Sequence, residues 1–330
     1  MDDAARRQLA RKRLVNVLLS HGAACARTLE QKIADAGPNN QRIDPHVLTP
    51  ERNGLVREGI LDKTKRYGVN WFFLTDSDPE VVDARIDEQG KIYRELHKGG
   101  RNQRIGDCLE IAIYRALKAQ DQLEYFGSFP DLDKHDDSQR YKKIEPPNHQ
   151  SDNHLKSGKN VDFIVYHRTI PSGSAAIEAK NIREWLYPDR REVLQLLQKA
   201  LTLNCVPVMI SRRIPFVTLK VLNPCGILFH QTYNQLFPEA DRELAEKVKH
   251  KKMLGFHDIR IGNEPDSRLM RFIGTNLPNL LPEARQRFEH YKDLLSAFSF
   301  GDMSYKEFAA RVRRREQGQD ENFDPINSPF

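Results

Sequence analysis

Two short stretches decide how the middle of this chain folds: Val161-Asp162-Phe163-Ile164-Val165 and Ala176-Ile177-Glu178-Ala179-Lys180-Asn181. Each is mostly apolar and carries acidic residues at few positions, as expected of strands in a covered sheet. On a strand, Glu178 and Lys180 point to one face, and Ile177 and Ala179 point to the other. Residues 161–167 and 175–180 are therefore predicted to be neighbouring antiparallel strands, a pairing that can bring Asp162 and Glu178 to the same end of the sheet.

This pairing of acids has a chemical consequence. Two carboxylates held together repel each other unless a cation neutralises them, so the arrangement favours a divalent metal. Oxygen ligands select Mg²⁺, with Mn²⁺ as a substitute, over zinc. The alternative is an ordinary ion pair between Glu178 and Lys180 at a strand end, which needs no metal.

The flanking sequence supplies further elements and a third acid. A helix is predicted from Ile105 to about Lys118, with Glu110 on the flank of its apolar stripe and Asp107 further toward solvent. From that flank Glu110 can reach the sheet edge, and an ordinary surface glutamate is the alternative. The remaining predicted elements are a strand at 124–129, a polar insertion at 130–158, a helix at 189–203 and a strand at 206–211. This order indicates an α/β layer structure.

Taken together, these residues resemble the PD-(D/E)XK, restriction-endonuclease-like nuclease fold over residues 105–230, although Val161 stands where the motif has its leading proline. The resemblance implies a mixed sheet flanked by helices. It implies that Asp162, Glu178 and the Ala179 carbonyl bind the metal, that Lys180 is the catalytic lysine and that Glu110 is an outer acid. It also implies hydrolysis of phosphodiester bonds to a 3′-hydroxyl and a 5′-phosphate.

Gln195 is a further candidate for the site. It lies on the helix predicted at 189–203, beside the apolar stripe of that helix. One interpretation is that its amide hydrogen bonds to substrate or to water near the metal. An exposed helix glutamine with no such role is the alternative.

Residues 1–75 read as a separate DNA-binding domain. Helices are predicted at 9–19, at 28–36 and from about Thr49-Pro50 to Gly59, followed by a β-hairpin that ends at 69–74. Three short helices and a hairpin describe a winged helix-turn-helix, in which the third helix reads bases and the wing contacts phosphates. The predicted DNA-binding residues are Arg52, Asn53 and Arg57 on the third helix and Lys63, Lys65 and Arg66 in the wing. A role in dimerisation or as a spacer is the alternative.

The remaining segments complete the predicted organisation. Residues 76–104 are predicted to be a connector that is acidic at first and then charged and helical, and residues 231–315 are predicted to form a helical C-terminal region with helices at 238–251, 280–298 and 304–315. Ser304 and Glu307 read as a capping box at the start of the last of these helices. The tail at 316–330 is predicted to be disordered.

Composition limits the function classes. The chain has 330 residues, 39% of them hydrophobic and 30% charged, with a net charge of +6, which permits a nucleic-acid partner. No apolar run approaches the roughly 18 residues of a membrane span, and the N-terminus lacks the apolar core of a signal peptide. The four cysteines lie far apart, which argues against a zinc knuckle or a disulfide framework and favours a reducing cytoplasm.

These observations lead to one functional hypothesis and two alternatives. The sequence predicts a metal-dependent endonuclease for double-stranded DNA, of a restriction or other DNA-defence type. A homodimer is expected, because cutting both strands requires two active sites. One alternative is a DNA-binding regulator whose nuclease-like domain is inactive. The other is a structure-specific nuclease acting on branched DNA or on RNA.

Overall fold

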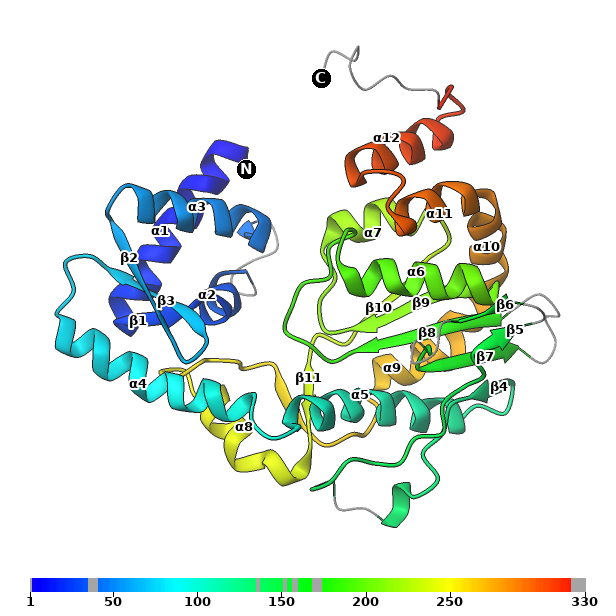
Figure 1. Cartoon of the computed structure of the whole chain (residues 1–330), viewed down its shortest axis with the longest axis horizontal. Coiled ribbons are helices and arrows are strands. Elements are labelled where there is room, and N and C mark those ends of the chain that lie inside the picture. The colour runs from blue at the N-terminus through cyan, green and yellow to red at the C-terminus, as the bar shows by residue number, and fades with distance from the viewer. Residues whose placement is uncertain are drawn as a thin grey trace. The chain divides into compact units, whose positions relative to one another are not determined.

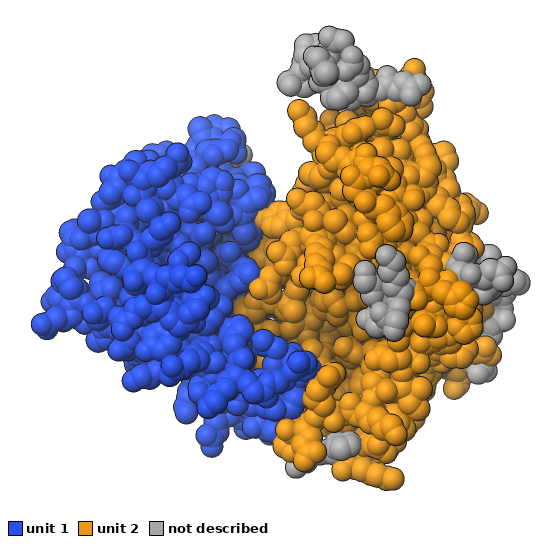
Figure 2. All heavy atoms as spheres, in the orientation of Figure 1, with its two compact units in different colours: residues 1–104, 237–261 blue, residues 105–236, 262–330 orange. Residues whose placement is uncertain are grey.

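The structure is a computed structural model, and it describes residues 2–34, 41–134, 137–150, 153–155, 160–167 and 174–321. The chain divides into two compact units (Figure 1 and Figure 2). Unit 1 contains residues 1–104 and 237–261, and unit 2 contains residues 105–236 and 262–330. Across the described ranges, no helix is both long enough and apolar enough to cross a bilayer.

Unit 1 begins with three helices and a three-stranded antiparallel sheet in the order β1-β3-β2. The elements are α1 (Asp3–His21), β1 (Ala23–Cys25), α2 (Ala26–Ile33), α3 (Pro45–Arg57), β2 (Leu61–Arg66) and β3 (Val69–Leu74). Their apolar faces meet in one core that includes Leu14, Leu29, Leu48 and Phe72. The three predicted helices and the hairpin are therefore present, and β1 is an additional strand that the sequence analysis did not identify.

The helix boundaries in unit 1 differ from the predicted ones. Helix α3 starts at Pro45 rather than near Thr49-Pro50, with Asp44 at its N-cap. Proline is well tolerated in the first turn of a helix, so Pro45 marks the true start, and Pro50 lies inside the helix. The end predicted for the second helix, at 35–36, lies outside the described residues.

The segment predicted as a connector contains a helix of unit 1. Helix α4 (Pro79–Leu96) is capped by Asp78, whose side chain accepts a hydrogen bond from the Glu80 backbone, and it buries Val82 and Ile86. Unit 1 also contains α8 (Arg242–Lys249) and β12 (Ile259–Ile261), which come from a part of the chain that the sequence analysis placed in the C-terminal region. The break between Arg104 and Ile105 agrees with the predicted boundary, whereas residues 237–261 belong to unit 1 and not to a C-terminal region.

Unit 2 is built on a mixed five-stranded sheet in the order β10-β9-β8-β7-β4. The strands are β4 (Leu123–Phe126), β7 (Phe163–His167), β8 (Ser174–Lys180), β9 (Val206–Ser211) and β10 (Leu228–Gln231). Strands β8, β9 and β10 are parallel, whereas β7 runs antiparallel to both β4 and β8. The chain therefore has a mixed α/β fold, and the predicted antiparallel pairing of β7 with β8 is confirmed.

Two hydrophobic cores cover the two faces of this sheet. On one face, Ala176 and Met209 pack with α6 (Arg191–Leu203), α11 (Lys292–Phe300) and α12 (Tyr305–Glu316). On the other face, Ile177 and Val208 pack with α5 (Arg101–Lys118) and α10 (Leu277–His290). Figure 1 shows α6 and α5 on opposite sides of the sheet. Alternate residues of β8 thus belong to opposite cores, as a strand covered on both faces requires.

The helices that follow residue 261 belong to unit 2 rather than to a separate C-terminal region. The short helices of unit 2 are α7 (Phe216–Leu222), α9 (Ser267–Arg271) and the π-helical turn η4 (Phe272–Asn276). The helix predicted at 280–298 is two helices, α10 and α11, separated at Tyr291. Ser304 caps α12 by accepting a hydrogen bond from the Glu307 backbone at 3.2 Å, which is one half of the predicted capping box, and the Glu307 side chain binds Arg311 at 2.7 Å. Within the predicted tail, Glu321 forms an ion pair with Arg315, and residues 322–330 lie outside the described residues.

The remaining short elements lie in loops. They are β5 (His149–Gln150), β6 (Asn153–His154), β11 (Gln235–Phe237) and the 3₁₀ turns η2 (Leu132–Lys134) and η3 (Glu239–Asp241).

Candidate functional site

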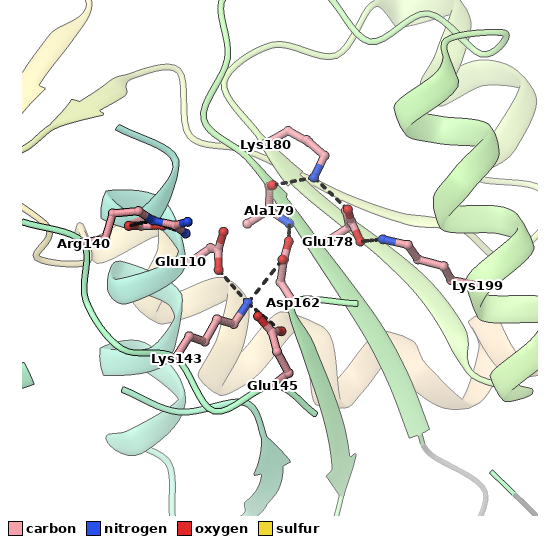
Figure 3. Close-up of polar contacts among 10 residues, drawn as sticks. Glu110, Arg140, Lys143, Glu145, Asp162, Glu178, Ala179, Lys180 and Lys199 are labelled. Carbon is pink, nitrogen blue, oxygen red and sulfur yellow. Dashed lines mark hydrogen bonds and ion pairs between the residues drawn. The ribbon is translucent and has the colours of Figure 1, made fainter. Parts of the chain in front are cut away.

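The sheet of unit 2 brings four of the predicted residues, Asp162, Glu178, Ala179 and Lys180, to one edge. Strand β8 ends at Lys180, and β7 starts at Phe163, directly after Asp162. Because β7 and β8 are antiparallel, the start of one lies beside the end of the other. Asp162 and the segment Glu178–Lys180 are therefore neighbours at this edge (Figure 3).

Asp162 is fixed by the backbone of β8. Its Oδ2 atom accepts a hydrogen bond from the Ala179 amide at 2.7 Å, and its own amide donates to the Ile177 carbonyl at 3.0 Å. Gly127 lies against the same residue: its φ is +104°, and a Cβ there would come within 2.7 Å of the Asp162 carbonyl oxygen. Only glycine therefore allows the chain after β4 to approach Asp162 this closely.

Glu110 reaches the edge from α5, and its partner is a lysine. The Lys143 ammonium lies 2.6 Å from Glu110 Oε2 and 3.3 Å from Asp162 Oδ1 (Figure 3). Burial raises the pKa of the Glu110 carboxyl to about 7, Asp162 adds to the rise, and Lys143 opposes it. Glu110 is thus part of the cluster, and the alternative of an isolated surface glutamate is excluded.

Lys143 is a residue that the sequence analysis missed, because it lies in the polar insertion. Two contacts of neighbouring residues hold the segment around Lys143 in position. The Ile144 amide and carbonyl bond to Ser128 at 2.8 and 3.0 Å, and Arg140 donates two hydrogen bonds to Asp107 at 3.0 and 3.1 Å. Asp107 is consequently buried, which corrects the expectation that it faces solvent. Asp107 and Glu110 lie three residues apart on α5, so Arg140 and Lys143 dock on the same face of that helix.

Glu178 lies on the α6 side of the sheet and binds two lysines. Its Oε1 accepts from Lys180 Nζ and its Oε2 from Lys199 Nζ, each at 2.7 Å (Figure 3). Lys180 Nζ also donates to the Ala179 carbonyl at 3.1 Å. Burial alone would lower the pKa of Lys180, but Glu178 and then Asp162 outweigh it, so the pKa is raised and the ammonium stays charged. Lys199, from α6, is the second lysine that sequence reasoning missed.

The acids and lysines therefore form two linked groups. Glu110, Lys143 and Asp162 form one, and Glu178, Lys180 and Lys199 form the other. Ala179 joins them, because its amide binds Asp162 and its carbonyl binds Lys180. The predicted acids are brought to one edge, but each carboxylate is neutralised by an ammonium group.

The positions of these acidic side chains bear on whether they suit a divalent cation. Among the described residues, no group of three or more His, Cys, Asp or Glu side chains is gathered as a metal site. Glu110 and Asp162 nevertheless direct oxygen atoms toward one cationic nitrogen, that of Lys143. Carboxylate oxygens are the ligands that Mg²⁺ and Mn²⁺ prefer, so the chemistry of Glu110 and Asp162 would suit one such ion. Glu178 belongs to the other group, so the ligand set implied by the resemblance remains a prediction.

Gln195 lies one helical turn before Lys199, on the same face of α6. Both residues line a cavity of about 340 Å³. The other residues that line it are His154, Leu155, Gln198, Thr202 and Phe300. Gln195 is therefore next to the lysine that binds Glu178, and its role toward substrate remains a prediction.

In unit 1, the structure changes the predicted set of DNA-binding residues. Arg52 is only 8% exposed, with its guanidinium 4.5 Å from the centre of the Phe72 ring, so its assignment as a base-reading residue is corrected. Arg66 binds Asp83 at 2.8 Å and Asp87 at 2.6 Å, both on α4. Asn53 and Arg57 on α3, and Lys63 and Lys65 on β2, are exposed.

Comparisons with models of protein families, with curated proteins and with solved structures found no match to this chain. The resemblance to PD-(D/E)XK nucleases therefore stays a prediction from the sequence.

Proposed function

We propose that this chain is a divalent-metal-dependent DNA endonuclease. One observation carries the proposal: Asp162 and Lys180, from neighbouring antiparallel strands, meet at one sheet edge, where Glu110 from α5 and Glu178 join them. An acidic pair beside a fixed ammonium is the combination that phosphodiester hydrolysis needs. The acids hold a hard cation, and the ammonium stabilises the charge that grows on the phosphate.

Each residue of the proposed site has a separate role. The Ala179 amide orients Asp162, and Glu178 with the Ala179 carbonyl holds Lys180 in a partly buried position. A preorganised, charged lysine costs no reorganisation when it meets an anionic phosphate. Glu110 and Asp162 would hold Mg²⁺ or Mn²⁺, which when bound polarises the scissile phosphate and lowers the pKa of a bound water.

The test is cleavage of supercoiled plasmid DNA with Mg²⁺ and with a chelator. The natural chain is expected to cut only with the metal, and Asp162→Asn is expected to cut at least about 100-fold more slowly, a loss of roughly 2.7 kcal/mol of transition-state stabilisation. Asp121→Asn makes the same chemical change at an exposed turn and serves as the control. Cleavage by Asp162→Asn at the rate of the natural chain would show that Asp162 does not belong to an active site. DNA binding without any cleavage by the natural chain would favour the inactive regulator.

We propose that the first part of unit 1 is a winged helix that binds duplex DNA. The exposed Asn53 and Arg57 lie on the same face of α3, and the exposed Lys63 and Lys65 lie on the hairpin. A helix presenting Asn and Arg fits the major groove, and hairpin lysines fit the phosphate backbone. A homodimer, with one active site for each strand, and use in DNA defence are fold-level analogies that belong to the same proposal.

The wing prediction is tested by the salt dependence of DNA binding. Lys63→Gln with Lys65→Gln is expected to weaken binding and to lower the slope of log affinity against log salt by about 2, because each lysine releases about one counterion. Fluorescence anisotropy of a labelled duplex in the presence of a chelator measures this without cleavage. Lys91→Gln, an exposed lysine of α4, is the control in the same unit. An unchanged slope would assign the hairpin to dimerisation or to a spacer role.

A further inference from the structure

Lys143 occupies the position between two carboxylates that come from different elements. Its ammonium lies 2.6 Å from Glu110 and 3.3 Å from Asp162, and Glu145 Oε2 is 3.5 Å away. The side chain is only 11% exposed, and its ammonium lies 5.2 Å from the centre of the Phe163 ring. An ammonium held by three acids and an aromatic ring is a built feature of this edge rather than a freely moving surface lysine.

The segment that carries Lys143 is anchored on both sides. Before it, Arg140 binds Asp107 through two hydrogen bonds. After it, Ile144 forms a two-bond bridge to Ser128, the residue next to the Gly127 that packs on Asp162. The Arg140 side chain and the Ile144 backbone therefore hold Lys143 beside Glu110 and Asp162. In this state the cation that neutralises the two acids is part of the chain.

We propose that Lys143 is a tethered competitor for the divalent cation: it neutralises Glu110 and Asp162 when no metal is bound, and it must withdraw before a metal binds them. This inference rests on the proposed function, because it treats Glu110 and Asp162 as metal-binding residues. An ammonium and a divalent ion repel each other and cannot share the same two oxygen atoms. The competition lowers the apparent metal affinity and couples metal binding to a movement of the Lys143 side chain.

If Lys143 competes with the metal, removing its charge is expected to raise the metal affinity. Replacing Lys143 with methionine keeps an unbranched side chain and removes the charge, so metal no longer has to displace two charge-assisted hydrogen bonds. Lys143→Met is expected to bind Mn²⁺ at least tenfold more tightly than the natural full-length chain, as measured by isothermal titration without DNA. Lys142→Met removes an exposed charge one residue away and is expected to leave the affinity unchanged.

A second measurement uses the natural chain and does not depend on how a variant folds. Lys143 is nearly buried and bonded to two acids, so it is expected to react slowly with an amine-acetylating reagent. Adding saturating Mn²⁺ is expected to raise its acetylation severalfold, as quantified by mass spectrometry, while the acetylation of Lys142 stays constant. A Lys143 whose reactivity does not change on metal binding would overturn the proposal.

The outcomes separate this inference from the proposed function. If the natural chain binds Mn²⁺ and Asp162→Asn does not, the metal site stands. In that case, an affinity of Lys143→Met equal to or weaker than that of the natural chain shows that Lys143 supports the site instead of competing for it, and the inference fails alone. If neither the natural chain nor Lys143→Met binds Mn²⁺, both proposals fail.

Discussion

Glu178→Gln is expected to lower the free energy of unfolding by about 3–5 kcal/mol, the loss typical of removing one partner from a buried ion pair. The Glu178 side chain is only 7% exposed, and each of its oxygen atoms accepts from a lysine at 2.7 Å. A neutral amide leaves the ammonium groups of Lys180 and Lys199 without the anion that holds both of them. Urea denaturation, followed by circular dichroism, measures the loss as a lower midpoint.

A second substitution tests the cause of that loss. Lys199→Met, added to Glu178→Gln, removes the more deeply buried of the two cations, so the double variant is expected to be about 1–3 kcal/mol more stable than Glu178→Gln alone. Glu283→Gln is the matched control, because its ion pair with Arg287 is exposed and is worth less than about 1 kcal/mol. If Lys199→Met lowered the stability further, the two side chains would not depend on each other, and the prediction would be wrong.

The same double variant separates folding from the proposed chemistry. Its stability is expected to recover, whereas DNA cleavage is expected to stay lost, because the carboxylate that holds Lys180 is still missing. Recovery of cleavage together with stability would show that Glu178 supports only the fold.

The strands at the site were predictable because their sequences have few competing interpretations. Residues 206–211 are mostly apolar, and the bounds predicted for this strand are those of β9. The alternation in 175–180 predicted that Glu178 and Lys180 share a face, and both bind on the same side of β8. The antiparallel pairing of the first two strands then fixed the edge where Asp162 lies.

The two lysines that neutralise the acids were harder to find. Lys143 lies in a polar segment without periodicity, and its position depends on long-range contacts with Ser128 and α5, which no local pattern encodes. For Lys199, in contrast, the helical periodicity of the sequence does contain a signal. It is a charged residue between Leu196 and Ala200 on the buried side of α6, where only a paired cation is tolerated.

For Arg52, the helical periodicity of the sequence predicts burial, in conflict with the expected contact to DNA bases. It follows Leu48 by four residues and precedes Leu55 by three, and both leucines are buried, so helical periodicity places Arg52 on the inner face of α3. Burial lowers the pKa of its guanidinium and leaves Nε and Nη1 without hydrogen-bond partners among the described residues. The expectation that arginine on a recognition helix contacts DNA therefore applies to Arg57 and not to Arg52.

Gly226→Ala is expected to lower the free energy of unfolding by about 3–5 kcal/mol, through a close approach between two backbones that the sequence does not reveal. Gly226 lies between α7 and β10 with φ at +83°, a conformation that costs alanine about 1–2 kcal/mol. A Cβ there would lie 2.3 Å from the Ala284 carbonyl oxygen and 2.5 Å from the Phe288 nitrogen. Both atoms belong to the backbone of α10, so no side-chain rotation relieves the clash.

Gly301→Ala separates the two contributions. Gly301 ends α11 with φ at +92°, and a Cβ there would meet nothing within 4 Å, so only the backbone strain of about 1–2 kcal/mol is expected. Urea denaturation of both variants gives the steric part as the difference between them. Equal losses would show that α10 shifts away from residue 226 at little cost.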